Sequence, residues 1–167
     1  MTTTLDDLKE AFAGESQANR RYLAYAEKAE DEGFPGVGKL FRAVAAAETI
    51  HAHAHLKAMG GVAATLANLA DAMAGEKHEF TEMYPPMLAR AEAEGNRKAA
   101  RSMRFALEVE KVHHDLFEKA HAAVAAGTDL ADPTLRVCPI CGHTVIGEAP
   151  DSCPVCGCKG ERFDEIG

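Results

Sequence analysis

Apolar residues recur every three or four positions along most of the chain, which is the pattern of amphipathic helices that bury one face. Thr4 is the expected N-cap of the first such helix. Pro85-Pro86 must kink or interrupt the third, because proline lacks the backbone N–H and its ring crowds the preceding turn. The pattern predicts four long helices, over residues 4–32, 37–59, 65–95 and 97–126. The first 126 residues therefore read as an all-α four-helix bundle.

A glutamate interrupts the middle of each apolar stripe, where a charge is costly unless something compensates it. One such glutamate alone is more often a partly solvated side chain at a stripe edge. Four at comparable depth favour a two-metal carboxylate site inside the bundle. The four residues are Glu15, Glu48, Glu76 and Glu110.

Histidines strengthen this interpretation on two of the helices. His51 follows Glu48, and His113 follows Glu110, at the i+3 spacing that puts both side chains on one helix face. His114, at i+4 from Glu110, could also reach a metal. The i+3 motif favours His113, but the spacing does not decide between them.

Two Cys-x-x-Cys turns follow a linker predicted over residues 127–136, within which Gly127 to Pro133 have the composition of a loop. They predict a small four-cysteine metal domain over residues 137–167, since so short a segment cannot build an adequate core alone. Four thiolates suit a structural zinc or a redox-active iron equally well, and ligand spacing does not separate the two. Cys158 has no evident partner. The predicted ligands are Cys138, Cys141, Cys153 and Cys156.

The net charge of −8 argues against nucleic acid and anionic membranes as partners. No apolar run approaches the ~20 residues of a membrane span. The N-terminus lacks the basic and apolar regions of a signal peptide. A cytoplasmic location follows as an expectation, and with it reduced thiols rather than disulfides.

In these motifs the chain resembles the rubrerythrins. Gly14-Glu15 to Tyr22 resembles the family's first ligand motif with its tyrosine, and the two Glu-x-x-His motifs and the Ala74–Pro85 segment resemble the rest of the bundle signature. The two cysteine turns resemble the C-terminal rubredoxin-like domain, although His143 stands where the family often has an aromatic residue. The resemblance implies a ferritin-like bundle with a rubredoxin-like domain.

The resemblance also implies ligand roles. Glu79 would be the additional carboxylate that distinguishes the family from ferritins, and one iron would move between His51 and Glu79 as its oxidation state changes. Tyr22 would orient ligands from the outer shell, and Tyr84 would do so or would simply be a core tyrosine. The implied metal ligands of the bundle are Glu15, Glu48, His51, Glu76, Glu79, Glu110 and His113.

The implied function is a non-haem di-iron peroxidase that reduces hydrogen peroxide to water. Electrons would come from a rubredoxin or an NAD(P)H-linked reductase through one iron held by the four cysteines, a site that could carry zinc in recombinant protein. The alternative is a ferroxidase that uses O2 at the same di-iron centre. The four-cysteine domain argues against it, because iron storage needs no electron relay.

The connection between the second and third helices bears on assembly. A ferritin-type bundle needs a crossover of roughly 30 Å there, whereas residues 60–64 span at most about 18 Å. Either the helices are simply antiparallel, or two chains exchange helix pairs. The resemblance favours a homodimer with exchanged helix pairs.

Overall fold

The computed structural model describes residues 2–131 and 134–167. The chain folds as two compact units, residues 1–63 and 64–167. The predicted all-α bundle with a small four-cysteine domain is confirmed as a fold class. Within the described residues, no helix is both long enough and apolar enough to cross a membrane.

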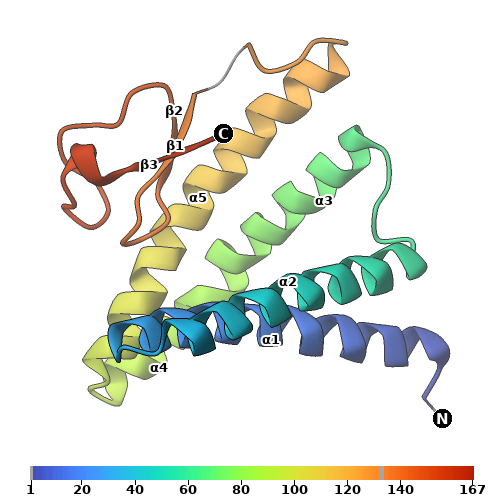
Figure 1. The fold of residues 1–167 in the computed structure, drawn as a ribbon. Coiled ribbons are helices and arrows are strands. Elements are labelled where there is room, and N and C mark those ends of the chain that lie inside the picture. The colour runs from blue at the N-terminus through green and yellow to red at the C-terminus, as the bar shows by residue number, and fades with distance from the viewer. Residues whose placement is uncertain (1, 132–133) are drawn as a thin grey trace. The chain divides into compact units, whose positions relative to one another are not determined.

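The first unit is a hairpin of two long helices, α1 (Thr4–Asp31) and α2 (Pro35–Ala58), which pack against each other (Figure 1). Thr3, rather than the predicted Thr4, caps α1: its hydroxyl accepts the backbone N–H of Asp6, and the Asp6 carboxylate accepts the N–H of Thr3. Helix α2 begins two residues before the predicted start, because the fixed φ of Pro35 suits a first helical turn.

Small side chains let α1 and α2 approach closely. Ala26, Ala45 and Ala52 are buried to 5% exposure or less. Asn19 is also buried, and its amide donates to the Ala45 carbonyl oxygen at 2.7 Å and to the Thr49 hydroxyl at 2.9 Å. This packing fixes the rotation of the two helices about their axes, and so the directions of the side chains on their other faces.

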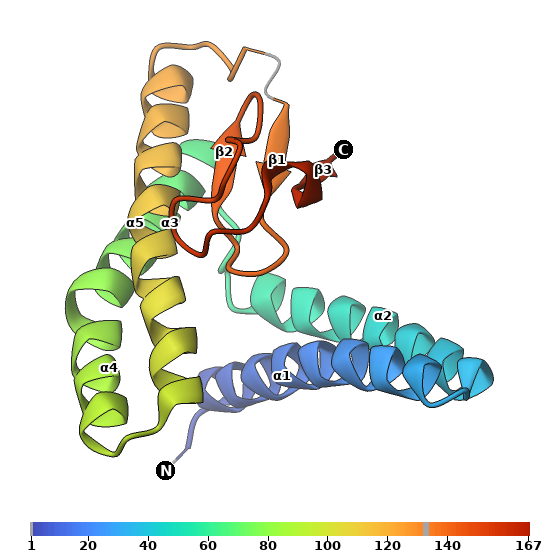
Figure 2. The ribbon, with the colours of Figure 1, turned by 90° about the vertical axis from the view of Figure 1, so that its left-hand side faces the viewer.

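The second unit starts with the predicted third helix, which consists of three segments: α3 (Thr65–His78), the π-helical turn η1 (Glu79–Met83) and α4 (Tyr84–Ala93). The interruption expected at Pro85-Pro86 lies just before the prolines. A widened turn there relieves the clash that the Pro85 ring would make with the carbonyl four residues earlier. Helix α5 (Arg97–Ala125) packs along α3 and α4 (Figure 2).

The chain ends in a small antiparallel sheet of order β2-β1-β3, with β1 (Leu135–Val137), β2 (Thr144–Ile146) and β3 (Asp164–Ile166) and the short 3₁₀ turn η2 (Gly160–Arg162). Strand β1 begins inside the segment predicted as linker, and residues 132–133 of that linker lie outside the described residues. The core of this domain is Cys138, Cys153 and Phe163. Strand β2 contacts α5.

Candidate metal centres

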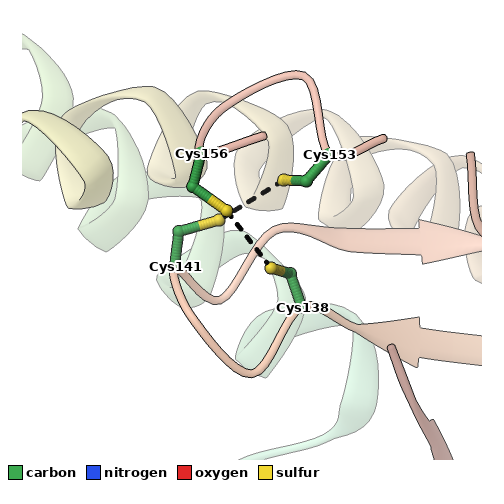
Figure 3. Close-up of side chains that lie close together, drawn as sticks. All are labelled: Cys138, Cys141, Cys153 and Cys156. Atoms are coloured by element: carbon green, nitrogen blue, oxygen red, sulfur yellow. Dashed lines mark hydrogen bonds between the residues drawn. The ribbon is translucent and has the colours of Figure 1, made fainter. Parts of the chain in front are cut away.

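Four thiols converge at one end of the small sheet (Figure 3). The Sγ atoms of Cys138 and Cys156 lie 3.5 Å apart, and those of Cys141 and Cys153 lie 3.6 Å apart. A tetrahedral ion with metal–sulfur bonds of about 2.3 Å holds its sulfurs about 3.8 Å apart. The thiols therefore fit a single tetrahedral ion with little movement.

Backbone amides prepare this site for thiolates. Burial tends to raise the pKa of Cys138, but the N–H groups of Ile140 and Cys141 and the neighbouring Cys156 thiol outweigh it and lower that pKa to about 7. Burial raises the pKa of Cys141. The site can thus form a first thiolate near neutral pH, and the remaining protons leave as a metal binds.

A second group of ligands lies on the α1–α2 hairpin. Nδ1 of His51 lies 2.9 Å from a carboxylate oxygen of Glu48 and 3.9 Å from one of Glu15. Glu15 and Glu48 are half-buried, whereas His51 is exposed. These separations suit three ligands of one metal ion.

A third group lies between α3 and α5. It brings together Glu76, Glu110 and His113, whose Nδ1 lies 2.8 Å from a carboxylate oxygen of Glu110. Burial and the neighbouring charge of Glu110 raise the pKa of Glu76. Two carboxylates that destabilise each other in this way are a site at which a cation would bind favourably.

The other predicted bundle residues lie outside these groups. Glu79 opens the π turn, and burial together with the charge of Glu76 raises its pKa. The Tyr22 ring packs on Phe41 at 6.0 Å between centroids, and its hydroxyl has no hydrogen-bond partner among the described residues.

Two residues that the sequence left open have identifiable surroundings. His114 packs edge-on against Phe80, while His113 joins the ligand group, so the geometry favours His113 as the ligand. Burial is the main cause of the raised pKa of the Tyr84 phenol. The negative charges of Glu79, Glu110 and Glu76 raise that pKa further. Tyr84 therefore lies among the carboxylates, as an outer-shell residue would.

One contact of His113 could not be predicted from the sequence. Its Nε2 lies 3.0 Å from the Thr144 hydroxyl and 3.3 Å from the Gly142 carbonyl oxygen, and the Thr144 hydroxyl donates to that same carbonyl. Because a carbonyl oxygen only accepts, the Gly142 contact requires a hydrogen on Nε2, and with a metal bound beside Glu110 the Nδ1 atom would give its lone pair to that metal. Gly142 directly follows Cys141, so this contact joins the third ligand group to the four-cysteine site.

Comparisons with known proteins cover both parts of the chain. The family model described as "Rubrerythrin" matches residues 6–121, and "Rubrerythrin, rubredoxin-like domain" matches residues 137–164. "Rubrerythrin-2" of Clostridium acetobutylicum is 36% identical over 96% of this chain and 95% of its own length. "Nigerythrin" of Nitratidesulfovibrio vulgaris is 34% identical over 92% of this chain and 82% of its own length. A solved structure of partially reduced nigerythrin, 31% identical, aligns with a TM-score of 0.59 over 99% of this chain and 88% of that one.

Proposed function

The chain belongs to the rubrerythrin family, and we propose that it is a di-iron peroxidase that reduces hydrogen peroxide to water with electrons relayed through its four-cysteine domain. Proteins of this family are generally peroxide-reducing di-iron proteins with a rubredoxin-like domain. The glutamate–histidine groups and the four cysteines fit iron cofactors. In the proposal, an NAD(P)H-linked reductase or a rubredoxin supplies the electrons.

The contact between His113 and the loop after Cys141 is the main observation that supports the proposed electron relay. From the Cys141 sulfur, covalent bonds run to the Gly142 carbonyl, and one hydrogen bond from Nε2 of His113 completes a path to a predicted di-iron ligand. A structural zinc domain would have no need of this connection. A dedicated electron relay requires a short path of this kind.

The residues of the bundle have complementary tasks in the proposal. Glu48 and Glu110 would be shared by the two metals, Glu15 and Glu76 would each hold one of them, and His113 would hold one metal. His51 and Glu79 would hold the other metal in its two oxidation states, because a neutral imidazole suits the lower charge of Fe(II) and a carboxylate better compensates Fe(III). When bound, the iron pair supplies two electrons and polarises peroxide.

Proton delivery falls to a side chain near the metals. Glu79 is the candidate, because burial and the charge of Glu76 raise its pKa and make it a better proton donor near neutral pH. Tyr22 and Tyr84 orient ligands from the outer shell.

We extend the proposal to the assembly, a homodimer in which two chains exchange helix pairs. Among the described residues, each unit contains one glutamate–histidine group of three ligands, which is too few for two irons. Residues 59–64 connect α2 to α3 and span at most about 20 Å, too short for a ferritin-type crossover. Val37 and Leu40, which belong to the predicted core stripe of α2, are 46% and 63% exposed in a single chain. A complete site would combine Glu15, Glu48 and His51 of one chain with Glu76, Glu79, Glu110 and His113 of its partner.

The test uses the iron-loaded full chain, reduced under anaerobic conditions and mixed with either peroxide or O2. We expect the absorption of the ferric four-thiolate centre to return much faster with peroxide than with O2. A faster return with O2 would instead identify the ferroxidase. If the absorption of the four-thiolate centre in iron-reconstituted protein did not respond to peroxide, the proposed relay would be refuted.

A further inference from the structure

A groove lies beside the four-cysteine loop, on the side where α5 begins. Its volume is about 460 Å³, and it runs between the first turns of α5 and the loop that carries two of its lining residues, Ile140 and Cys141. Ile140 is 43% exposed, and Cys141 is half-buried. A predicted thiolate ligand of the relay centre thus reaches a concave and partly apolar surface.

The helix side of this groove is positively charged. Lys98 and Arg101 line it, both are exposed, and neither forms an ion pair with any described residue. By contrast, Arg104 one turn further along is paired with Glu92. Arg101 is held over the Phe105 ring, with its guanidinium carbon 5.1 Å from the ring centroid. The groove therefore presents two uncompensated cations, of which Arg101 is held in place by the Phe105 ring.

These cations stand out against the charge of the rest of the chain. The net charge is −8, and four thiolates around one iron are negative in both oxidation states of the iron. An anionic partner that approached the relay centre would be repelled at most places on the surface. At this groove the local charge is reversed, which both attracts and orients such a partner.

We propose that this groove is the docking site of an acidic one-electron carrier protein, with Lys98 and Arg101 as its anchoring charges and Ile140 as its apolar contact. The inference rests on the proposed function, because it names the entry point of the relay. The carrier loses one electron and the ferric four-thiolate iron gains it, so that two carriers are oxidised for each peroxide reduced. A small anionic metabolite and an acidic peptide are the other candidates for such a groove, and neither delivers electrons.

Binding can be measured without any turnover. The full iron-loaded chain and a purified rubredoxin, a small acidic one-electron carrier, are titrated together with both proteins in the ferric state. We expect binding to weaken steeply between 0.05 and 0.5 M salt, as the Debye length falls from over 10 Å to about 4 Å. We also expect Lys98→Glu, which removes no side-chain hydrogen bond or ion pair to any residue that the structure describes, to weaken binding about tenfold at low salt.

Lys119→Glu is the matched control, because Lys119 is an exposed lysine in the C-terminal half of the same helix and lies outside the groove. Equal weakening by the two variants would show an effect of net charge alone and would overturn the docking site. Wild-type affinity in Lys98→Glu would overturn it as well. The visible spectrum of the ferric centre reports whether each variant is folded. Should Lys98→Glu fail to fold, Lys98→Gln gives the same test with half the change in charge.

Reduction rates separate docking from damage to the iron centre. Reduced rubredoxin should reduce the Lys98→Glu variant about tenfold more slowly than wild type, whereas the small cation of reduced methyl viologen should not be slowed. A slowing with both reductants would refute the proposal. Reoxidation of the chemically reduced variant by peroxide needs no carrier, so this step fails only if the proposed peroxidase function itself is wrong.

Discussion

At the level of single residues, Thr144 is a side chain that positions His113 in the proposed relay and that no sequence motif reveals. Its hydroxyl accepts from Nε2 of His113 and donates to the Gly142 carbonyl oxygen, so one bond holds the imidazole and the other holds the hydroxyl in place. We expect Thr144→Val, which keeps the shape and removes both bonds, to slow electron transfer from the four-thiolate centre about tenfold or more, as losses of outer-shell ligand partners generally do.

Thr144→Ser is the matched control, because it restores the hydroxyl and should return the rate close to that of wild type. The measurement is stopped-flow recovery of the ferric four-thiolate absorption after peroxide is added to the reduced protein. A second readout is the reduction potential of the di-iron site, which should shift in the valine variant only. Equal rates for the valine and serine variants would exclude a role for the hydroxyl.

The Glu76 carboxylate carries a pH dependence that the metal-free bundle should show. Burial and Glu110 raise its pKa, so the folded chain holds a proton that the unfolded chain loses first. Stability then falls as the pH rises through the unfolded pKa toward the folded one, and the loss is complete once the pH exceeds the folded pKa. We expect Glu76→Gln to raise the melting temperature at pH 7 by about 1–2 °C, a small gain because a partly exposed charge is screened.

At pH 4 the same substitution should change the melting temperature little, because the carboxyl is then mostly protonated. Circular dichroism melts after chelation of the bundle metals, with the four-cysteine iron retained, give the comparison. Glu118→Gln on the exposed side of α5 serves as the control and should show no gain at pH 7. A gain of equal size at both pH values would contradict the assigned cause.

Most of the candidate ligands could be predicted from the sequence because they are charged residues at positions where the pattern calls for apolar ones. Glu15, Glu48, Glu76 and Glu110 interrupt apolar stripes, and a spacing of three residues ties a histidine to two of them. Thr144 has no such conflict: a threonine in a short strand is ordinary, and its importance arises only when β2 packs on α5. Residues that act through a tertiary contact leave no trace in local patterns.

At the level of elements, the α1–α2 hairpin depends on small residues where the helices meet. Ala45 is 2% exposed, and its carbonyl accepts from the buried Asn19 amide. We expect Ala45→Leu to destabilise the protein by about 1–3 kcal/mol, because extra carbons in a tightly packed contact force the helices apart. It should also lower metal content in the bundle, since Glu15 and Glu48 come from the two different helices.

Ala46→Leu makes the same chemical change at the next position, which is exposed, and should alter stability by less than about 0.5 kcal/mol. Urea titration gives the stabilities, and iron analysis gives the occupancy. If the two variants lost equal stability, the close approach of the helices would not be what positions these ligands.

Helix boundaries show where the sequence was and was not sufficient at this level. The spacing of apolar residues predicted every long helix. Helix α2 starts earlier than predicted because Pro35 suits the first turn of a helix as well as it suits a loop. The sequence predicted that the helix would be interrupted at Pro85-Pro86, but it did not predict the form of the interruption. A π turn rather than a kink results because the backbone absorbs the missing hydrogen bond one turn upstream, where it also sets the direction of Glu79.

At the level of the whole molecule, the exchange of helix pairs can be tested by complementation between two inactive chains. One chain carries Glu48→Ala and lacks the ligand group of the first unit. The other carries Glu110→Ala and lacks that of the second unit. Each alone should bind little iron in the bundle and should not reduce peroxide.

The two arrangements differ when the chains are refolded together. With exchange, a mixed dimer has one site built from both damaged halves and one built from both intact halves. Random pairing makes half of the dimers mixed, so the mixture should regain about one quarter of the wild-type peroxidase activity and bundle iron. Without exchange, every site in every dimer contains one damaged half, and the mixture stays as inactive as its components.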